Sequence, residues 1–195
     1  METRRKPETV AEVIRPAKTV ALCAHVNPDG DTIGSTLALC HGLKALGKQV
    51  ALFCQDKVPD NLRFLPGVSA FRTPEKAEGM TFDLLVAVDV SDQRRMGDCD
   101  RLLQQCGHSA QIDHHGTNPD YAEVNDIDPS ASATGLLVRE VLGLLNVPLT
   151  REIGMCLYTA ISTDTGNFSF GNTTAEAFFV MSELMGLNLP LSDMN

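Results

Sequence analysis

The chain has 195 residues, 43% of them hydrophobic, which is enough to bury the core of one domain with little left for a second. Its net charge of −9 excludes broad binding to long nucleic acid, which requires a basic face that displaces phosphate counterions. No apolar run reaches the roughly 18 residues of a membrane span, and the N-terminus lacks the apolar core of a signal peptide. We therefore expect a cytoplasmic protein that makes no membrane contact.

The first 54 residues contain two predicted strands. Residues 1–16 are polar and charged, so we expect a tail or a short helix there. The run KTVALCA, residues 18–24, is short, apolar and rich in β-formers, which predicts a buried strand. Apolar residues recur at three and four positions over 33–46, which indicates a helix that ends at Gly47. A second strand, QVALFC, follows at 49–54.

The middle of the chain contains the strongest strand signal. Residues 58–80 hold several prolines and glycines, and we interpret them as a loop with short elements. The following run FDLLVAVD, residues 82–89, is uniformly apolar, as expected of a strand covered on both faces. A short helix over 98–106 and a strand over 109–112 are predicted next.

Three helices are predicted in the last third. Two cover 134–145 and 151–162, and the start of the third is marked by a capping-box spacing at 173–176. Gly186 ends that helix. Residues 189–195 are interpreted as the start of a linker to a second domain.

Strands that alternate with helices predict right-handed βαβ units. The expected fold class is therefore α/β, with a doubly wound, mainly parallel sheet of five strands and helices on both faces, in one domain over 17–188. Ligands in such sheets collect at the carboxyl ends of the strands, near the point where the strand order reverses. The six cysteines show no C-x-x-C spacing and mostly lie in apolar segments, so we expect reduced core residues.

Six potential metal ligands lie at the ends of four separate apolar runs. Four are carboxylates and two are imidazoles, which is more than one divalent ion needs and suits two ions that share a bridging carboxylate. The six residues are His25, Asp29, Asp31, Asp89, His114 and Asp164. Three of them lie in the loop HVNPDGDTIGS, where Pro28 restricts the backbone and Gly30 permits a sharp turn. Read alone, this loop has an alternative interpretation as a simple turn in which Asp31 is a helix N-cap.

The motifs HVNPDGD, VAVDVSD, DHH and TAISTDTG resemble, in order and spacing, the four signature motifs of the DHH phosphoesterase family. The resemblance covers roughly residues 19–187 and is strongest to bacterial oligoribonuclease and phosphoadenosine-phosphate phosphatase proteins. RecJ-like exonucleases and manganese-dependent pyrophosphatases are more distant. The resemblance implies two divalent cations, Mn²⁺ in preference to Mg²⁺. His25 and Asp29 would bind the first and Asp31, His114 and Asp164 the second, with Asp89 bridging both.

The resemblance also implies roles for residues outside the metal set. His115 would contact the substrate phosphate and, with Asp89, form the catalytic pair, although a paired histidine can also be structural. Asp113 would orient an imidazole. Arg94 and Arg95 are near enough to Asp89 in sequence to contact phosphate, and the alternative is a solvated pair.

The function implied is metal-dependent hydrolysis of phosphodiester or phosphomonoester bonds, with short oligoribonucleotides, linear dinucleotides or 3′-phosphoadenosine 5′-phosphate giving mononucleotides. The partner would be a short RNA or small nucleotide, and the resemblance suggests a homodimer. Two alternatives stay open, a manganese-dependent inorganic pyrophosphatase and a non-catalytic nucleotide-binding module. Relatives continue into a second domain that grips the substrate, so we expect this chain alone to bind substrate weakly.

Overall fold

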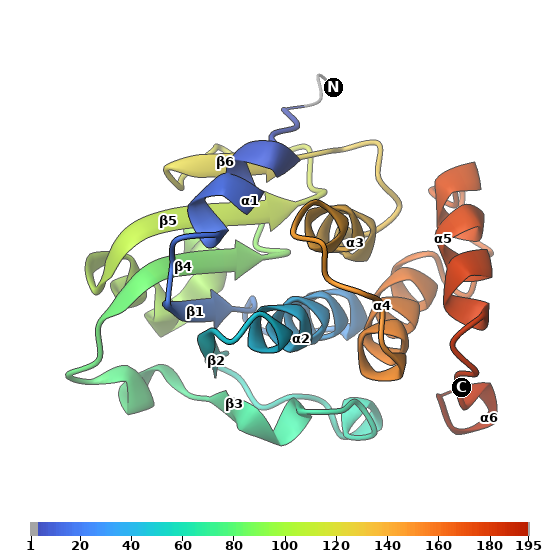
Figure 1. Cartoon of the computed structure of the whole chain (residues 1–195), viewed down its shortest axis with the longest axis horizontal. Helices are drawn as coiled ribbons and strands as arrows, with labels where there is room; N and C mark the ends of the chain where they lie inside the picture. Colours follow the sequence, from blue (N-terminus) through green and yellow to red (C-terminus); the bar gives the residue numbers. More distant parts are fainter. Residues whose placement is uncertain (1–3, 195) are drawn as a thin grey trace.

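A single parallel sheet organises the computed structural model, which describes residues 4–194 (Figure 1). The strands are β1 (Thr19–Cys23), β2 (Gln49–Phe53), β3 (Phe71–Arg72), β4 (Phe82–Val88), β5 (Cys106–Asp113) and β6 (Val124–Ile127). Their order is β3-β2-β1-β4-β5-β6, and every adjacent pair is parallel. The predicted α/β fold with a doubly wound parallel sheet is confirmed.

The predicted number of five strands was wrong, because the described residues form six. β3 has only two residues, and β6 reads VNDI, with two polar residues among four. Neither segment is long enough to show a periodic pattern.

The helices follow the predicted positions closely. The α-helices are α1 (Pro7–Ile14), α2 (Gly30–Ala45), α3 (Thr134–Leu144), α4 (Arg151–Asp164), α5 (Ala175–Met185) and α6 (Leu191–Met194). The 3₁₀ segments are η1 (Asp60–Leu62), η2 (Val68–Ala70), η3 (Pro74–Ala77) and η4 (Gln93–Gln104). α1 lies within the segment expected to be a tail or helix, and α6 lies within the segment expected to begin a linker. The domain limits themselves stay predictions.

Two predicted boundaries on either side of residue 106 were wrong. The helix expected over 98–106 is the 3₁₀ segment η4, which begins at Gln93 and is interrupted at Gly97, where φ is 57°. β5 begins at Cys106, three residues earlier than expected, because Cys106 pairs with Phe82 of β4. The polar residues at the start of β5 hid this extension from the apolar pattern.

The sheet buries both of its faces, in two separate cores. Leu84, Val86 and Val88 of β4 belong to the larger core, with residues of α1 to α5, whereas Leu85 and Ala87 belong to a smaller one that includes buried residues of η3 and η4. Alternate residues of β4 therefore point into different apolar layers, which explains the uniformly apolar run. The second face is covered by 3₁₀ segments rather than by α-helices.

The N-terminal segment covers the outer edge of the sheet. Arg4 forms an antiparallel bridge with Ile127 of β6, and Arg5 forms ion pairs with Asp126, Asp128 and Glu140. All six cysteines are free, and all but Cys106 are buried, as expected. Within residues 4–194, the helices are too short or too polar to cross a membrane. The cytoplasmic location stays a prediction.

Candidate metal centre

The predicted ligands gather at the carboxyl edge of the sheet, where the strand order reverses between β1 and β4. His25 lies two residues after β1, Asp89 directly follows β4, and His114 directly follows β5. Because these strands are parallel, their carboxyl ends lie side by side. Five elements thereby contribute to one site, since the start of α2 and the end of α4 supply the other three residues.

Asp29 and Asp31 occupy the first turn of α2. Asp29 is the N-cap, and its Oδ1 accepts hydrogen bonds from the backbone N–H groups of Asp31 and Thr32, both at 3.1 Å. Its Oδ2 stays free to face His25. The alternative in which Asp31 is the N-cap is therefore wrong, since Asp31 lies inside the helix.

The Asp31 carboxylate is almost completely buried and caps a second helix. It accepts hydrogen bonds from Thr134 N at 2.7 Å, Gly135 N at 3.1 Å and Ser35 Oγ at 2.8 Å. The N-cap residue of α3 is Ala133, which has no capping side chain, so Asp31 binds the free N–H groups of Thr134 and Gly135 instead. The sequence prediction missed Thr134, Gly135 and Ser35, although a helix that starts without its own cap was a usable signal.

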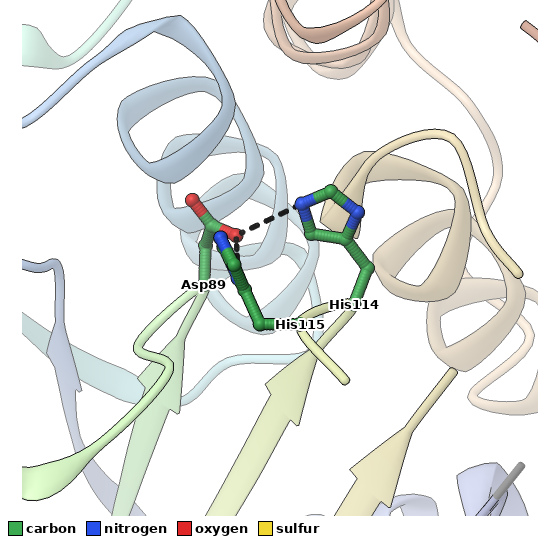
Figure 2. Close-up of side chains that lie close together, drawn as sticks. All are labelled: Asp89, His114 and His115. Atoms are coloured by element: carbon green, nitrogen blue, oxygen red, sulfur yellow. Dashed lines mark ion pairs between the residues drawn. The ribbon is translucent and has the colours of Figure 1, made fainter. Parts of the chain in front are cut away.

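Asp89 lies at the centre of the cluster with its carboxylate shared between two sides. Its Oδ2 is 3.5 Å from His25 Nε2, whereas its Oδ1 is 3.7 Å from His114 Nε2. Oδ1 also accepts a hydrogen bond from Thr134 Oγ1 at 2.8 Å. Figure 2 shows that His114 and His115 approach the same carboxylate from the end of β5. Asp89 has a φ of 61°, an uncommon conformation for a non-glycine residue and one that occurs preferentially at functional sites.

The remaining contacts divide the cluster into two groups that share Asp89. In the first, His25 Nε2 is 3.5 Å from Asp29 Oδ2. In the second, His114 Nε2 is 3.5 Å from Asp164 Oδ2 and 3.8 Å from Asp31 Oδ2. The side-chain ligand atoms of each group, His25–Asp29–Asp89 and Asp31–His114–Asp164, lie within 4.8 Å of one another.

Both imidazoles are oriented so that Nε2 faces the carboxylates. The Nδ1 atom of His25 is 2.7 Å from the carbonyl oxygen of Val26, and that of His114 is 3.2 Å from the carbonyl oxygen of Ala131. For His114, the carbonyl contact places a proton on Nδ1 and leaves Nε2 as the atom that faces the carboxylates. For His25, Nδ1 lies between the Val26 carbonyl oxygen and the Arg95 guanidinium, and Nε2 is again the atom that faces the carboxylates. A backbone carbonyl behind the ring is the usual device that fixes the tautomer of a metal-binding histidine.

The concentration of carboxylates shifts the pKa values in the direction expected of a site that lacks counter-charge. Burial, with repulsion from Asp89 and Asp164, raises the pKa of Asp31 well above its ordinary value. Burial is the main cause that raises the pKa of Asp164; the attraction of His114 opposes it, and repulsion from Asp89 and Asp29 adds to it. Burial acts to lower the pKa of His25, but Asp29 and Asp89 outweigh it and raise that pKa to about 9. A positive charge at this position would relieve all three shifts.

His115 differs from the other two histidines in its hydrogen bond. Its Nδ1 lies 2.8 Å from Asp113 Oδ1, and Asp113 is completely buried and also accepts a hydrogen bond from Asn118 Nδ2 at 2.7 Å. The hydrogen bond to Asp113 raises the pKa of His115. Since Nδ1 is the atom 3.6 Å from Asp89, and it is already committed to Asp113, only Nε2 is available to a ligand.

The two arginines lie on different sides of the site. The Arg95 guanidinium is 2.9 Å from His25 Nδ1, so it touches the side of that ring opposite Nε2. Arg94 is exposed and lines a cavity of about 470 Å³ together with Asp92, Thr117 and Tyr121. Thr117 lies two residues after His115. Contact between either arginine and a phosphate stays a prediction.

Close packing of α2 against α4 positions Asp31 and Asp164 at the same edge. A Cβ atom placed on Gly34 would lie 2.5 Å from the carbonyl oxygen of Cys156, which no real contact permits. Glycine at this position therefore lets the two helix backbones approach closely. The two acidic residues are carried on rigid elements rather than on loops.

The donor set fits two divalent cations. Each group offers one imidazole nitrogen and carboxylate oxygens, and Asp89 presents one oxygen to each group. This mixture of imidazole nitrogen and carboxylate oxygen suits divalent ions of intermediate hardness.

Comparison with known proteins agrees with this geometry. Residues 19–161 match the family model described as DHH family, N-terminal domain. The chain is 41% identical over 192 residues to the bifunctional oligoribonuclease and PAP phosphatase NrnA of Thermus thermophilus, covering 97% of the chain and 56% of that protein. The chain spans about half the length of the curated relatives that it matches.

Solved structures show the same fold. An exopolyphosphatase-related protein from Bacteroides fragilis matches with a TM-score of 0.88 and 26% identity, covering 96% of this chain and 58% of that one. A putative family II inorganic pyrophosphatase from Methanococcus jannaschii matches with a TM-score of 0.61 and 20% identity, covering 86% and 55%, which shows a shared fold alone. With a family model matched over most of its length and four motifs meeting at one edge of the sheet, the chain belongs to the DHH family.

Proposed function

We propose that this chain is the catalytic part of a two-metal phosphoesterase that hydrolyses short oligoribonucleotides, linear dinucleotides or 3′-phosphoadenosine 5′-phosphate to mononucleotides. The single observation that carries the proposal is the position of Asp89, whose two carboxylate oxygens face different groups of ligands. A bridging carboxylate of this kind holds two cations at a fixed separation.

The metals would activate a water molecule and neutralise phosphoryl oxygens, which is chemistry that the side chains alone do not supply. The protein's part is to hold these ligands rigidly. Thr134 fixes the orientation of Asp89, and the carbonyl groups behind His25 and His114 fix their rings. His115 binds Asp113 through Nδ1 and keeps Nε2 free, and in its protonated form Nε2 can donate a hydrogen bond to a phosphate oxygen.

The metal assignment that we propose follows the two groups. His25 and Asp29 hold one ion, Asp31, His114 and Asp164 hold the other, and Asp89 bridges them. Mn²⁺ is favoured over Mg²⁺ because two imidazoles contribute, whereas Mg²⁺ prefers oxygen ligands and retained water. Arg94 lies in a cavity near His115, where it would meet the negative charge of the substrate.

The substrate class is supported by the relatives rather than by the site alone. The Thermus thermophilus protein is named for activity on oligoribonucleotides and PAP, and its alignment at 41% identity covers 97% of this chain. A metal-dependent pyrophosphatase is a weaker candidate, since the similarity to the Methanococcus jannaschii protein lies at the level of the fold. The homodimer stays a prediction, which sedimentation velocity would check.

The test is hydrolysis of a substrate panel in Mn²⁺, with products separated by chromatography. The panel contains an RNA dinucleotide, 3′-phosphoadenosine 5′-phosphate and inorganic pyrophosphate. We expect the two nucleotides to be cleaved and pyrophosphate to be cleaved far more slowly, and Asp89→Asn to abolish turnover. Asp98→Asn is the matched control, because Asp98 is exposed and outside the cluster. Faster hydrolysis of pyrophosphate than of the two nucleotides would favour the pyrophosphatase alternative. Binding of the nucleotides with no hydrolysis of any substrate would favour the non-catalytic module.

A further inference from the structure

A second cavity lies along the same carboxyl edge of the sheet, on the β2 and β3 side of the metal centre. Its volume is about 480 Å³, within the usual range for small-molecule sites. It is formed by the segment that follows β2 and by residues of η2 and β3. The lining residues are Cys54, Asp56, Lys57, Val58, Arg63, Val68, Ser69, Phe71, Arg72 and Thr73.

The charge of this cavity is opposite to that of the chain as a whole. Three cationic side chains line it, Lys57, Arg63 and Arg72, whereas the chain carries a net charge of −9. Asp56 is its one acidic lining residue, and the carboxylate of Asp56 already accepts a hydrogen bond from the backbone N–H of Asn27 at 2.7 Å. The cavity therefore presents a local positive potential that favours an anion.

The three cations differ in how far their charge is already paired. Lys57 and Arg63 share one carboxylate, that of Asp60, at 2.9 Å each. The Arg72 guanidinium is exposed, and among residues 4–194 it has no ion pair or side-chain hydrogen bond. Three positive charges against the two carboxylates of Asp56 and Asp60 leave one positive charge in excess, and the unpaired Arg72 guanidinium is the group that a phosphate could meet.

The remaining wall of the cavity is apolar. Val58, Val68 and Phe71 are half-buried, and each packs against the larger core on one side and lines the cavity on the other. An aromatic ring and aliphatic groups beside cations form the combination that binds nucleotides, since the base contacts the apolar surface while the phosphate meets the cations.

The wall of the cavity contacts the segment that carries the predicted metal-binding residues His25 and Asp29 at two points. Cys54 Sγ lies 3.4 Å from the carbonyl oxygen of His25, and Asp56 binds Asn27, two residues before Asp29. Adjacent strands are roughly 5 Å apart, so β3 lies roughly 10 Å from β1, which carries His25. At roughly 3.4 Å per nucleotide along one stacked strand, that distance corresponds to about three nucleotides, and to fewer when the strand is extended.

We propose that this cavity is a subsite for a further nucleotide of the same RNA molecule whose scissile phosphate lies at the metal centre. Arg72 would contact the backbone phosphate of that nucleotide, and Phe71 with Val68 would contact its base. The inference rests on the proposed function and deepens it, because it assigns to this chain a means of gripping substrates longer than a dinucleotide.

The kinetic test compares a tetranucleotide with a dinucleotide in Mn²⁺. Arg72→Glu should lower the ratio of kcat/KM for the tetranucleotide to kcat/KM for the dinucleotide roughly tenfold. The main change should be a higher KM for the tetranucleotide, because the substitution removes one phosphate contact and puts a negative charge in its place. Arg63→Glu should act in the same direction. Arg151→Glu is the matched control, because it changes the net charge by the same amount and Arg151 does not line the cavity. Arg151 begins α4 and Asp164 ends it, so they are about 20 Å apart, and the control should leave the ratio unchanged.

A binding experiment separates failure of this inference from failure of the proposed function. A fluorescent phosphorothioate tetranucleotide, which resists cleavage, is titrated at several salt concentrations. Arg72→Glu should reduce the magnitude of the slope of log K against log salt concentration by at least about 0.7, the value for one phosphate contact on a single strand. If dinucleotides are hydrolysed but Arg72→Glu and Arg63→Glu leave both the ratio and the slope unchanged, the subsite does not exist. If no nucleotide is hydrolysed but the slope still changes, the proposed function fails and the subsite stands.

Discussion

Replacing Thr134 by valine tests whether the orientation of Asp89 depends on one hydroxyl group. Thr134 is completely buried, and its Oγ1 donates a hydrogen bond of 2.8 Å to a carboxylate that is only 2% exposed. Valine keeps the branched shape and the backbone N–H that binds Asp31. The substitution therefore removes the donor while it preserves the packing.

The magnitude follows from the charge of the acceptor. A buried hydrogen bond to a charged group contributes about 2 kcal/mol. For a chain of this length, 1 kcal/mol shifts Tm by about 2–4 °C, so the metal-free variant should melt about 4–8 °C lower. Loss of a group that orients a metal ligand should also weaken Mn²⁺ binding about 10–100-fold.

The assays are thermal unfolding of the metal-free chain and calorimetric titration with Mn²⁺. Thr134→Ser keeps the hydroxyl and should retain most of the affinity. Thr36→Val is the matched control, because the Thr36 hydroxyl is buried and has no hydrogen-bond partner among the described residues. That control should be neutral or stabilising. If Thr134→Val behaves like Thr36→Val in both assays, the orienting role of Thr134 is refuted.

Two further predictions concern helix packing and charge. Gly34→Ala should destabilise the chain by about 1–3 kcal/mol, because its Cβ would meet the carbonyl oxygen of Cys156, whereas Gly143→Ala, with open space at its Cβ, should stabilise it by up to about 1 kcal/mol. Urea unfolding measures both, and equal effects would contradict the close approach of α2 and α4. Asp164→Asn should stabilise the metal-free chain at neutral pH. Folding raises the pKa of Asp164, so the wild-type chain loses stability as pH rises from the pKa of Asp164 in the unfolded chain to its higher pKa in the folded chain. The difference in Tm should shrink as pH falls toward about 4, and a difference independent of pH would exclude this origin.

The sequence predicted the ligand cluster because the ligands lie at the ends of four apolar segments or in the loop that follows the first of them. His25, Asp89 and His114 end strands whose parallel arrangement follows from the alternation of strands and helices. The structure brings all six predicted metal-binding residues to one edge of the sheet. The spacing of apolar residues and the positions of the ligands along the chain were sufficient for this prediction, because a parallel sheet brings the carboxyl ends of its strands to one edge.

The supporting residues were missed because their roles arise only from tertiary packing. Thr134 and Ser35 are ordinary helix residues in the sequence, and their contact with the carboxylates depends on how α2 and α3 dock. β3 was missed because two residues carry no period, and η4 was misplaced because its break at Gly97 depends on the surrounding packing. Apart from the uncapped start of α3, local patterns do not report these features.

The most direct test of the two-metal centre is a titration of the metal-free chain with Mn²⁺, in which free Mn²⁺ is followed by electron paramagnetic resonance. We predict two ions bound per chain, with both sites weakened by Asp89→Ala and only one weakened by Asp164→Ala. Binding of a single ion, or a second ion unaffected by Asp89→Ala, would contradict the assignment of Asp89 as the bridge.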